Sequence, residues 1–157
     1  MQTNFDIKRT TTADEDFQLL VSLLDNELWN ELNEDQATYD PYNKVPDIKT
    51  AVVICADNQP AACGCFKIYD SETVEIKRMF VQKIYRGRGL SKQILNALEQ
   101  WAIEKGYSYA LLETSVHFKV ARRLYETSGY TVVENYPPYT DLAESICMKK
   151  HLKTQVL

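Results

Sequence analysis

The chain has 157 residues, which fits one domain with a sizeable core, and we expect residues 1–157 to form a single domain. It is 45% hydrophobic and 25% charged, and its formal net charge is −4. General nucleic-acid binding is therefore not expected, and no apolar run is long enough to span a bilayer. Because residues 1–6 lack the basic and apolar regions of a signal peptide, we expect a cytoplasmic protein.

The first quarter of the chain predicts a strand, a helix and a long irregular segment. Residues 4–10 alternate weakly between polar and apolar side chains, as a strand does. Thr12 or Asp14 can cap the helix that follows. Its apolar stripe consists of Phe17, Leu20, Val21, Leu24 and Leu28. Residues 33–48 show no clear period, and irregular segments of this length in compact domains are often functional.

Three strands joined by short turns are predicted next. They cover residues 50–56, 61–69 and 73–81, and the short connections favour an antiparallel meander. Gly64, inside the second of these strands, indicates a bulge or a close approach of another element.

The stretch after the third strand predicts an anion-binding turn. Gly87 and Gly89 alternate with Arg86 and Arg88, and a helical apolar pattern begins at Leu90. The first turn of a helix carries unpaired N–H groups and a partial positive charge. Glycines let this backbone close on an anion, so the stretch suits a phosphate or pyrophosphate.

The remaining elements complete an α+β, three-layer architecture. The helix after the glycine turn ends at Gly106, and residues 107–115 form a strand parallel to residues 73–81. A helix from about Val120, a strand at 130–133 and a strand at 145–149 follow. We expect a mixed central sheet of about seven strands with helices on both faces.

The four cysteines are expected to be reduced and mostly buried. Cys63 and Cys65 lie two residues apart in a strand and should face the same side. Neither His117 nor His151 shows the spacing of a metal ligand, so no metal site is expected.

Two motifs together resemble the GNAT N-acetyltransferase superfamily, in particular its small bacterial single-domain members. The first is Arg86-Gly87-Arg88-Gly89-Leu90-Ser91, which is similar to the acyl-CoA loop of that family. The second is Ala121-Arg122-Arg123-Leu124-Tyr125-Glu126-Thr127-Ser128-Gly129-Tyr130, similar to Ala-x-x-Leu-Tyr-x-x-x-Gly-Phe/Tyr. The resemblance runs from about Phe5 to Lys150. Ser91 at the last small position and Phe118, where many relatives carry Asn or Gln, depart from it.

The resemblance implies acetyl-CoA as the cofactor, with its pyrophosphate on the N–H groups of residues 86–91. It also implies that Met79, Phe80 and Val81 pair with the pantetheine, and that Phe80 or Val81 supplies the oxyanion donor. Phe118 stands at a further cofactor-binding position. Tyr125 would protonate the departing thiolate.

Two carboxylates remain candidates for the general base, Glu75 and Glu113. Strand alternation puts Glu75 on one face with Lys77, Met79 and Val81 if no bulge intervenes. The structural alternative for Glu75 is an ion pair with Lys77 or with a neighbouring strand.

The acceptor is expected to be a small-molecule primary amine, such as an amino acid or a polyamine, attacked directly in a ternary complex. The expected pocket consists of Tyr39, Tyr42, Glu113, Tyr136 and Tyr139, whose rings suit a cationic amine. The alternatives are a non-catalytic acyl-CoA-binding module and acetylation of a peptide or protein amine. Domains that resemble this one often form homodimers. A P-loop is not expected, because Gly-Lys-Ser/Thr is missing.

Overall fold

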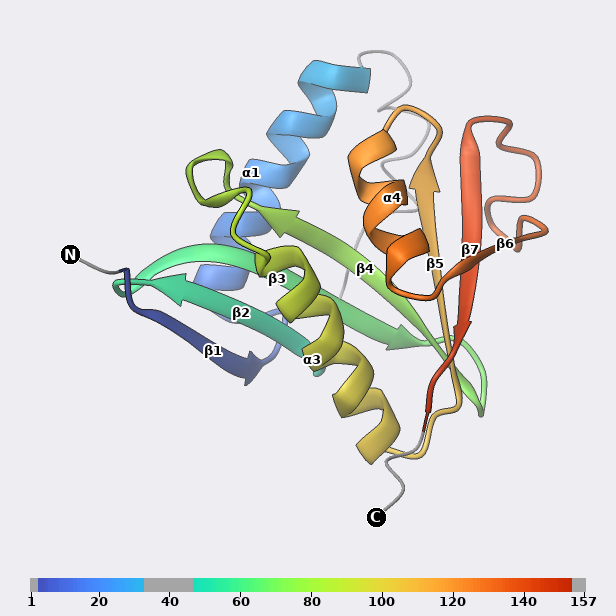
Figure 1. Ribbon diagram of the computed structural model, residues 1–157, viewed down its shortest axis with the longest axis horizontal. Coiled ribbons are helices and arrows are strands. Elements are labelled where there is room, and N and C mark those ends of the chain that lie inside the picture. Colours follow the sequence, from blue (N-terminus) through green and yellow to red (C-terminus); the bar gives the residue numbers. More distant parts are fainter. Residues whose placement is uncertain (1–2, 33–46, 154–157) are drawn as a thin grey trace. The chain divides into compact units, whose positions relative to one another are not determined.

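The computed structural model describes residues 3–32 and 47–153, with side chains from 29 to 32 left out. The elements are β1 (Phe5–Thr10), α1 (Glu15–Leu32), β2 (Ala51–Ala56), β3 (Gln59–Ile68), β4 (Thr73–Val81), η1 (Lys83–Tyr85), α3 (Leu90–Glu104), β5 (Tyr109–Ser115), α4 (Lys119–Thr127), β6 (Thr131–Val133) and β7 (Ser145–His151) (Figure 1). The strands are hydrogen-bonded in the order β1-β2-β3-β4-β5-β7-β6. The predicted α+β fold with a mixed seven-stranded sheet is confirmed. None of the described helices is long and apolar enough to cross a membrane.

The chain forms two compact units. The first contains the chain up to Phe66 together with Lys77–Leu98, and the second contains Lys67–Ile76 and the chain from Glu99 onward. Strand β4 and helix α3 each run through both units. The cofactor loop therefore lies in the first unit, and the residues of α4 lie in the second.

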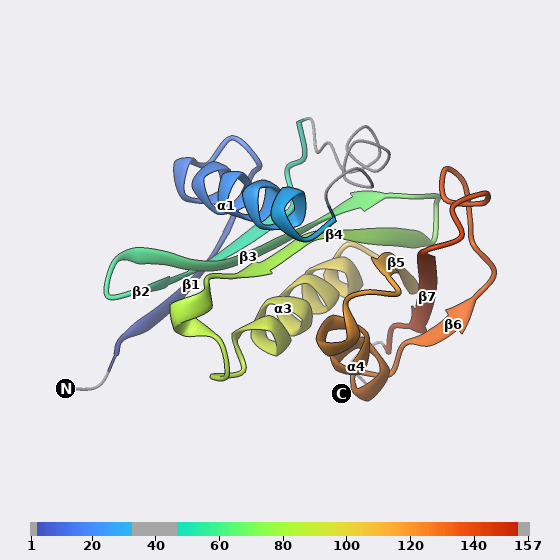
Figure 2. The same cartoon turned by 90° about the horizontal axis from the view of Figure 1, so that it is seen from above.

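In the first unit, helices cover both faces of the strands. Strand β1 pairs antiparallel with β2, and β2 pairs antiparallel with β3. Helix α1 lies on one face and α3 on the other (Figure 2). The core on the α1 side contains Phe17, Leu20, Ala51, Val53, Cys63, Cys65 and Phe80. The predicted common side of Cys63 and Cys65 is confirmed.

Helix α1 begins at a capping aspartate. Asp14 Oδ1 accepts hydrogen bonds from the N–H groups of Asp16 (2.9 Å) and Phe17 (3.1 Å). Its other oxygen, Oδ2, accepts from Thr10 Oγ1 and lies 3.1 Å from Lys8 Nζ. Of the two predicted caps, Asp14 is the one that caps, because its carboxylate satisfies N–H groups that the first helical turn cannot pair.

Gly64 allows α3 to approach β3 closely. A Cβ at this position would lie 2.7 Å from Ile94 Cγ2, 2.7 Å from Met79 Sδ and 3.0 Å from Leu98 Cδ1. A contact this short is not tolerated without movement of the neighbours. Of the two predictions for Gly64, close approach is confirmed.

Arg78, inside β4, has a φ of 58°. This left-handed conformation is uncommon for a residue with a side chain. Arg78 Nη1 lies 2.7 Å from Asp25 Oδ1 of α1, and Phe80 packs in the core on the same side. Met79 Sδ instead lies beside Gly64, toward α3.

The parity expected for β4 in the absence of a bulge is interrupted at Arg78. Within the second unit, Lys67 Nζ lies 3.6 Å from Glu75 Oε1. Within the first unit, Phe80 packs in the core on the α1 side, and Met79 Sδ lies beside Gly64. Because a left-handed residue stands between Glu75 and Met79, simple alternation does not assign these two side chains to one face.

The second unit contains the C-terminal half of the sheet. Strands β4 and β5 pair in parallel, as predicted, from Thr73 with Tyr109 to Glu75 with Leu111. Strand β7 pairs antiparallel with β5 along its full length and with β6 on its other side. The insertion of β7 between β5 and β6 was not predicted. A small core holds Leu111, Tyr136, Tyr139 and Cys147.

Candidate active site

The predicted anion-binding turn connects β4 to α3 through η1, a short helix that the sequence did not indicate. Gly87 has a φ of 81° and Gly89 a φ of 76°. Both values lie in the region that glycine adopts without strain. The two glycines therefore let the chain reverse twice before α3 starts at Leu90.

A row of main-chain donors follows from this turn. The first bond of α3 runs from the N–H of Gln93 to the carbonyl of Gly89. Within the described part of the chain, the N–H groups of residues 87–92 form no hydrogen bond. Unpaired donors at a helix N-terminus, in a glycine-rich turn, form a site for a phosphate-sized anion.

Arg86, an exposed residue, links the turn to α1. Its Nη2 lies 2.9 Å from Glu27 Oε1 and 2.8 Å from Glu27 Oε2, and its Nε donates to the carbonyl of Val81 at 2.8 Å. Its guanidinium also lies 5.7 Å from the ring centre of Phe80. The charge of Arg86 is therefore already balanced by a carboxylate of α1.

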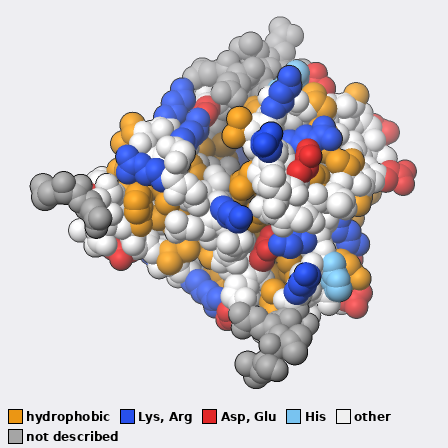
Figure 3. All heavy atoms as spheres, in the orientation of Figure 1, with side chains coloured by type: hydrophobic (Ala, Val, Ile, Leu, Met, Phe, Trp, Pro, Cys, Tyr) orange, Lys and Arg blue, Asp and Glu red, His pale blue; other side chains and the backbone are white. Residues whose placement is uncertain are grey.

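Arg88 is the second exposed cation of the turn. Its guanidinium lies 5.9 Å from the ring centre of Tyr85, and its Nη1 is 3.5 Å from Thr3 Oγ1. No acidic partner of Arg88 is found within the described residues. Basic side chains are conspicuous on the face shown in Figure 3, although the whole chain carries a net charge of −4.

In the segment before the turn the side chains are largely buried, so the part of it that a ligand could contact is the backbone. Phe80 and Val81 are buried and Met79 is half-buried. The pairing of β4 with β5 stops at Glu75 and Leu111, although both strands continue. The backbone of β4 beyond Glu75 is therefore not part of the ladder with β5, which is what the implied pairing with a pantetheine requires.

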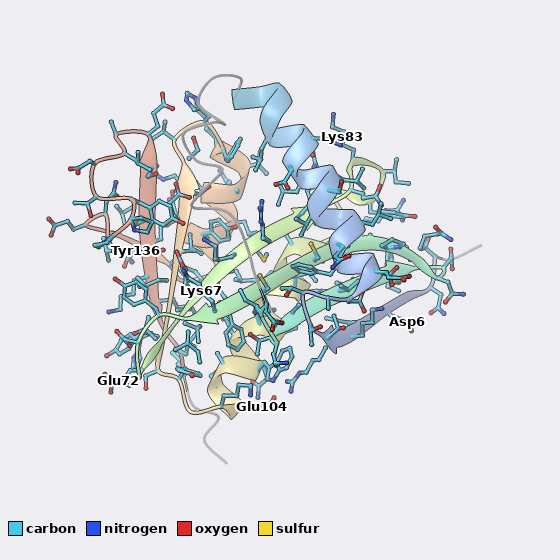
Figure 4. The ribbon with its side chains drawn as sticks, turned by 180° about the vertical axis from the view of Figure 1, so that it is seen from behind. Asp6, Lys67, Glu72, Lys83, Glu104 and Tyr136 are labelled. Atoms are coloured by element: carbon cyan, nitrogen blue, oxygen red, sulfur yellow. The ribbon has the colours of Figure 1, made fainter. Side chains whose placement is uncertain are left out.

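Glu75, in the second unit, is one of the two predicted bases. It is 2% exposed. Its Oε2 accepts a hydrogen bond from the Tyr136 hydroxyl at 2.7 Å, and Lys67 Nζ lies 3.6 Å from its Oε1. Figure 4 shows Lys67 and Tyr136 on the same side of these strands. The alternative of an ion pair with a neighbouring strand is confirmed, with Lys67 as the partner.

Tyr136 and Tyr139 were expected to line the acceptor pocket. Both are buried, Tyr139 to 1% exposure, and their rings pack edge to face with 5.5 Å between centroids. Tyr69 contacts Tyr136 in the same way at 5.3 Å and is more exposed. In this group of three tyrosines, Tyr139 is the most deeply buried and packs against Tyr136. Tyr39 and Tyr42 lie outside the described residues.

Glu113, the other predicted base, is half-buried on β5. Its Oε2 accepts a hydrogen bond from Ser145 Oγ at 2.6 Å. It stands opposite Cys147 in the strand register. Burial, together with the charges of Glu113 and Glu75, raises the pKa of Cys147 to about 11, although the Tyr136 N–H opposes this shift. Cys147 is therefore a neutral thiol and a poor nucleophile.

Tyr125 is buried on α4, and its hydroxyl is bonded to no described residue. Burial raises its pKa well above the ordinary tyrosine value, and the nearby charge of Glu113 raises it further. The phenol therefore keeps its proton. Tyr130 and Tyr136 differ from it, because each donates to a buried carboxylate.

Phe118 is the residue that caps α4, and its side chain makes no capping hydrogen bond.

The structure also contains three site features that sequence reasoning missed. They are the ion pair of Glu27 with Arg86, the ion pair of Lys67 with Glu75, and the buried carboxylate of Glu99. Only Glu99 had a sequence signal, because it stands four residues after Leu95 in the apolar stripe of α3.

The chain belongs to the acetyltransferase (GNAT) family, whose model matches residues 14–130. The uncharacterized N-acetyltransferase YsnE of Bacillus subtilis is 34% identical over 94 residues, which cover 59% of this chain and 62% of YsnE. The chain thus spans less than two thirds of that relative's length. An IAA acetyltransferase of Azospirillum brasilense is 34% identical over 109 residues, covering 68% of this chain and 70% of the relative.

Solved structures agree with the fold. A Klebsiella pneumoniae protein assigned as an acyl-CoA N-acyltransferase has a TM-score of 0.78 at 26% identity, covering 95% of this chain and 98% of that one. The structure of yncA from Salmonella typhimurium with acetyl-CoA has a TM-score of 0.69 at 16% identity, covering 98% of this chain and 97% of that one. The predicted family and fold are confirmed, and the named relatives support the predicted acyltransferase class.

Proposed function

We propose that this chain is an acetyl-CoA-dependent N-acetyltransferase whose acceptor is a primary amine of a small molecule. The observation that carries the proposal is the row of unpaired N–H groups at residues 87–92, which fits the pyrophosphate of coenzyme A. Acetyl-CoA, when bound, supplies an acetyl group on a thioester. The exposed Arg88 adds positive charge at this turn, and Arg86 with Glu27 keeps its shape.

We assign the proton transfers to two residues of the second unit. Glu113 accepts a proton from the acceptor amine, and Tyr125 donates one toward the leaving sulfur. Glu113 is favoured over Glu75 because it is more exposed and its charge acts on Tyr125, whereas Glu75 is buried and bonded to Tyr136 and Lys67. A main-chain N–H of Phe80 or Val81 stabilises the negative charge that develops on the carbonyl oxygen.

Direct attack by the amine is favoured over a covalent acyl-enzyme. The buried Cys147 is a neutral thiol, as its raised pKa requires. A neutral thiol is a much weaker nucleophile than a thiolate. A small cationic amine as the acceptor agrees with the half-buried carboxylate of Glu113 and with the negative net charge of the chain.

Replacing the proposed acid tests the assignment. We expect Tyr125→Phe to lower kcat about 100-fold, within the range that general acid–base catalysis supplies. The dissociation constant of acetyl-CoA should change little, because the ring remains. The measurement is thiol release with polyamines, amino acids and peptide N-termini as acceptors.

Tyr109→Phe is the matched control, because that tyrosine is stacked on His151 and plays no part in the proposed chemistry. Wild-type turnover in Tyr125→Phe would remove Tyr125 from the mechanism. Tight CoA binding without acceptor-dependent thiol release would favour the non-catalytic module instead. Release with peptides alone would identify a peptide acetyltransferase.

A further inference from the structure

A buried polar cluster lies next to Tyr125 in the second unit. Glu99, in the last part of α3, is 7% exposed. Its Oε2 accepts a hydrogen bond from the Tyr130 hydroxyl at 2.9 Å, and its Oε1 lies 2.7 Å from Lys150 Nζ of β7. A buried carboxylate with two such partners is held in one place.

Tyr130 connects this cluster to Tyr125. The two rings pack edge to face with 6.0 Å between centroids, and the N–H of Tyr130 donates to the carbonyl of Tyr125 at 3.0 Å. The chain turns between them at Gly129, which has a φ of 99°. One residue, Tyr130, thus touches both the ring and the backbone of Tyr125.

The side chain of Lys150, on β7, lies against the turn at Gly129. Its Cε and Cδ lie 3.4 and 3.7 Å from the position that a Cβ of Gly129 would occupy. Its Nζ lies 5.8 Å from the ring centre of Tyr130. The side chain therefore neutralises Glu99 and also fills the space beside Gly129.

We propose that Glu99 is a positioning residue for Tyr125, acting through the Tyr130 hydroxyl, with Lys150 as its counterion. This inference rests on the proposed role of Tyr125 as the general acid. The hydrogen bond from Tyr130 to Glu99 anchors the hydroxyl end of the Tyr130 side chain. The anchored ring in turn limits how far the Tyr125 side chain can swing about its Cα–Cβ bond, which is the rotation that moves its hydroxyl.

The key variant is Tyr130→Phe, which removes one hydrogen bond and keeps the ring and the Glu99–Lys150 ion pair. We expect kcat to fall about tenfold, because small misplacements of a catalytic group are costly. The dissociation constant of acetyl-CoA should stay within about twofold, since binding energy and positioning are separable. Glu99→Leu should behave like Tyr130→Phe, and Glu99→Gln, which retains an acceptor oxygen, should recover most of the loss.

A double-variant cycle isolates the route through Tyr125. If Glu99 acts through Tyr125, Tyr125→Phe/Tyr130→Phe will be no slower than Tyr125→Phe alone. The proposal would be overturned if the two substitutions lowered kcat independently, so that their fold losses multiplied in the double variant. A wild-type kcat in Tyr130→Phe would also overturn it. Lys149→Met is the matched control, because Lys149 lies 4.4 Å from the Tyr109 ring centre on the same strand and should leave kcat unchanged.

A measurement without turnover separates this inference from the proposed function. NMR of labelled tyrosine should show more averaging of the Tyr125 side chain between χ1 rotamers in Tyr130→Phe and not in Lys149→Met. Unchanged χ1 averaging would overturn the positioning role. Wild-type kcat in Tyr125→Phe would instead overturn the acid role of Tyr125, whatever the ring motion shows.

Discussion

At the scale of single residues, Asp14 shows how one carboxylate serves two purposes. It accepts two main-chain N–H groups at the start of α1, and it also binds Thr10 and Lys8. Burial acts to raise the pKa of Asp14, but the hydrogen bonds from Phe17, Lys8 and Thr10 outweigh it and lower the pKa overall. The folded state therefore prefers the charged form.

Asp14→Ala should lower the free energy of unfolding by about 1–2 kcal/mol, the usual cost of a lost cap. Because the folded pKa lies below the unfolded value of about 3.9, the charge-dependent part is fully present above that value and disappears as the pH falls through the folded pKa. Urea unfolding of both proteins from pH 7 downward measures this. Asp14→Asn, which can still cap, should lose less. A stability difference that grows on acidification would contradict the assignment.

The three tyrosines of the second unit show what the sequence could and could not predict. The motif around Tyr125 was enough to select this residue as a candidate, since its spacing on a helix is local. Nothing local distinguishes Tyr125 from Tyr130 and Tyr136, whose partners are 31 and 61 residues away. Tertiary contacts decide which of these tyrosine hydroxyls is left without a hydrogen-bond partner among the described residues. The spacing of residues along the chain does not reveal those contacts.

At the scale of elements, the close packing of α3 on β3 depends on a glycine, which has no side chain to separate them. Gly64 has an ordinary backbone conformation, so its role is spatial. We expect Gly64→Ala to lower the free energy of unfolding by about 1–3 kcal/mol, as overpacking does, and Gly64→Val to lower it more. Urea unfolding measures both. An alanine variant as stable as the wild type would show that α3 can shift freely.

The turn between β4 and α3 was the most predictable part of the site. Glycine positions, adjacent arginines and a helix start are all local signals, and all three are found where expected. The left-handed backbone of Arg78 was not predictable in the same way, because a residue with a side chain rarely adopts it. The binding of Arg86 by Glu27 was also missed, since the two lie 59 residues apart.

At the scale of the whole molecule, the environment of Tyr125 sets the pH dependence that we expect for the proposed acetyl transfer. Burial and the charge of Glu113 raise the pKa of Tyr125. A general acid works in its protonated form, so its contribution is retained up to the raised pKa and is lost only above it. We expect kcat to show no alkaline decline below about pH 10, the ordinary tyrosine value.

This expectation is tested by measuring kcat at saturating acetyl-CoA and acceptor, from pH 7 up to the highest pH at which the protein stays folded. Tyr125→Phe should give a lower rate with no alkaline decline of its own. An alkaline decline centred clearly below the ordinary tyrosine pKa, present in the wild type and absent from Tyr125→Phe, would mean that the phenol ionises too easily for its proposed role.

The ion pair between Arg86 and Glu27 has a consequence for the thermodynamics of ligand binding. It joins α1 to the turn before any anion arrives, together with the bond from Arg86 to the carbonyl of Val81. A loop that is ordered only on binding loses conformational entropy at that moment, which weakens affinity. Here the contacts of Arg86 already restrict one end of the turn when the protein folds. Association with a pyrophosphate should therefore need little rearrangement of the chain.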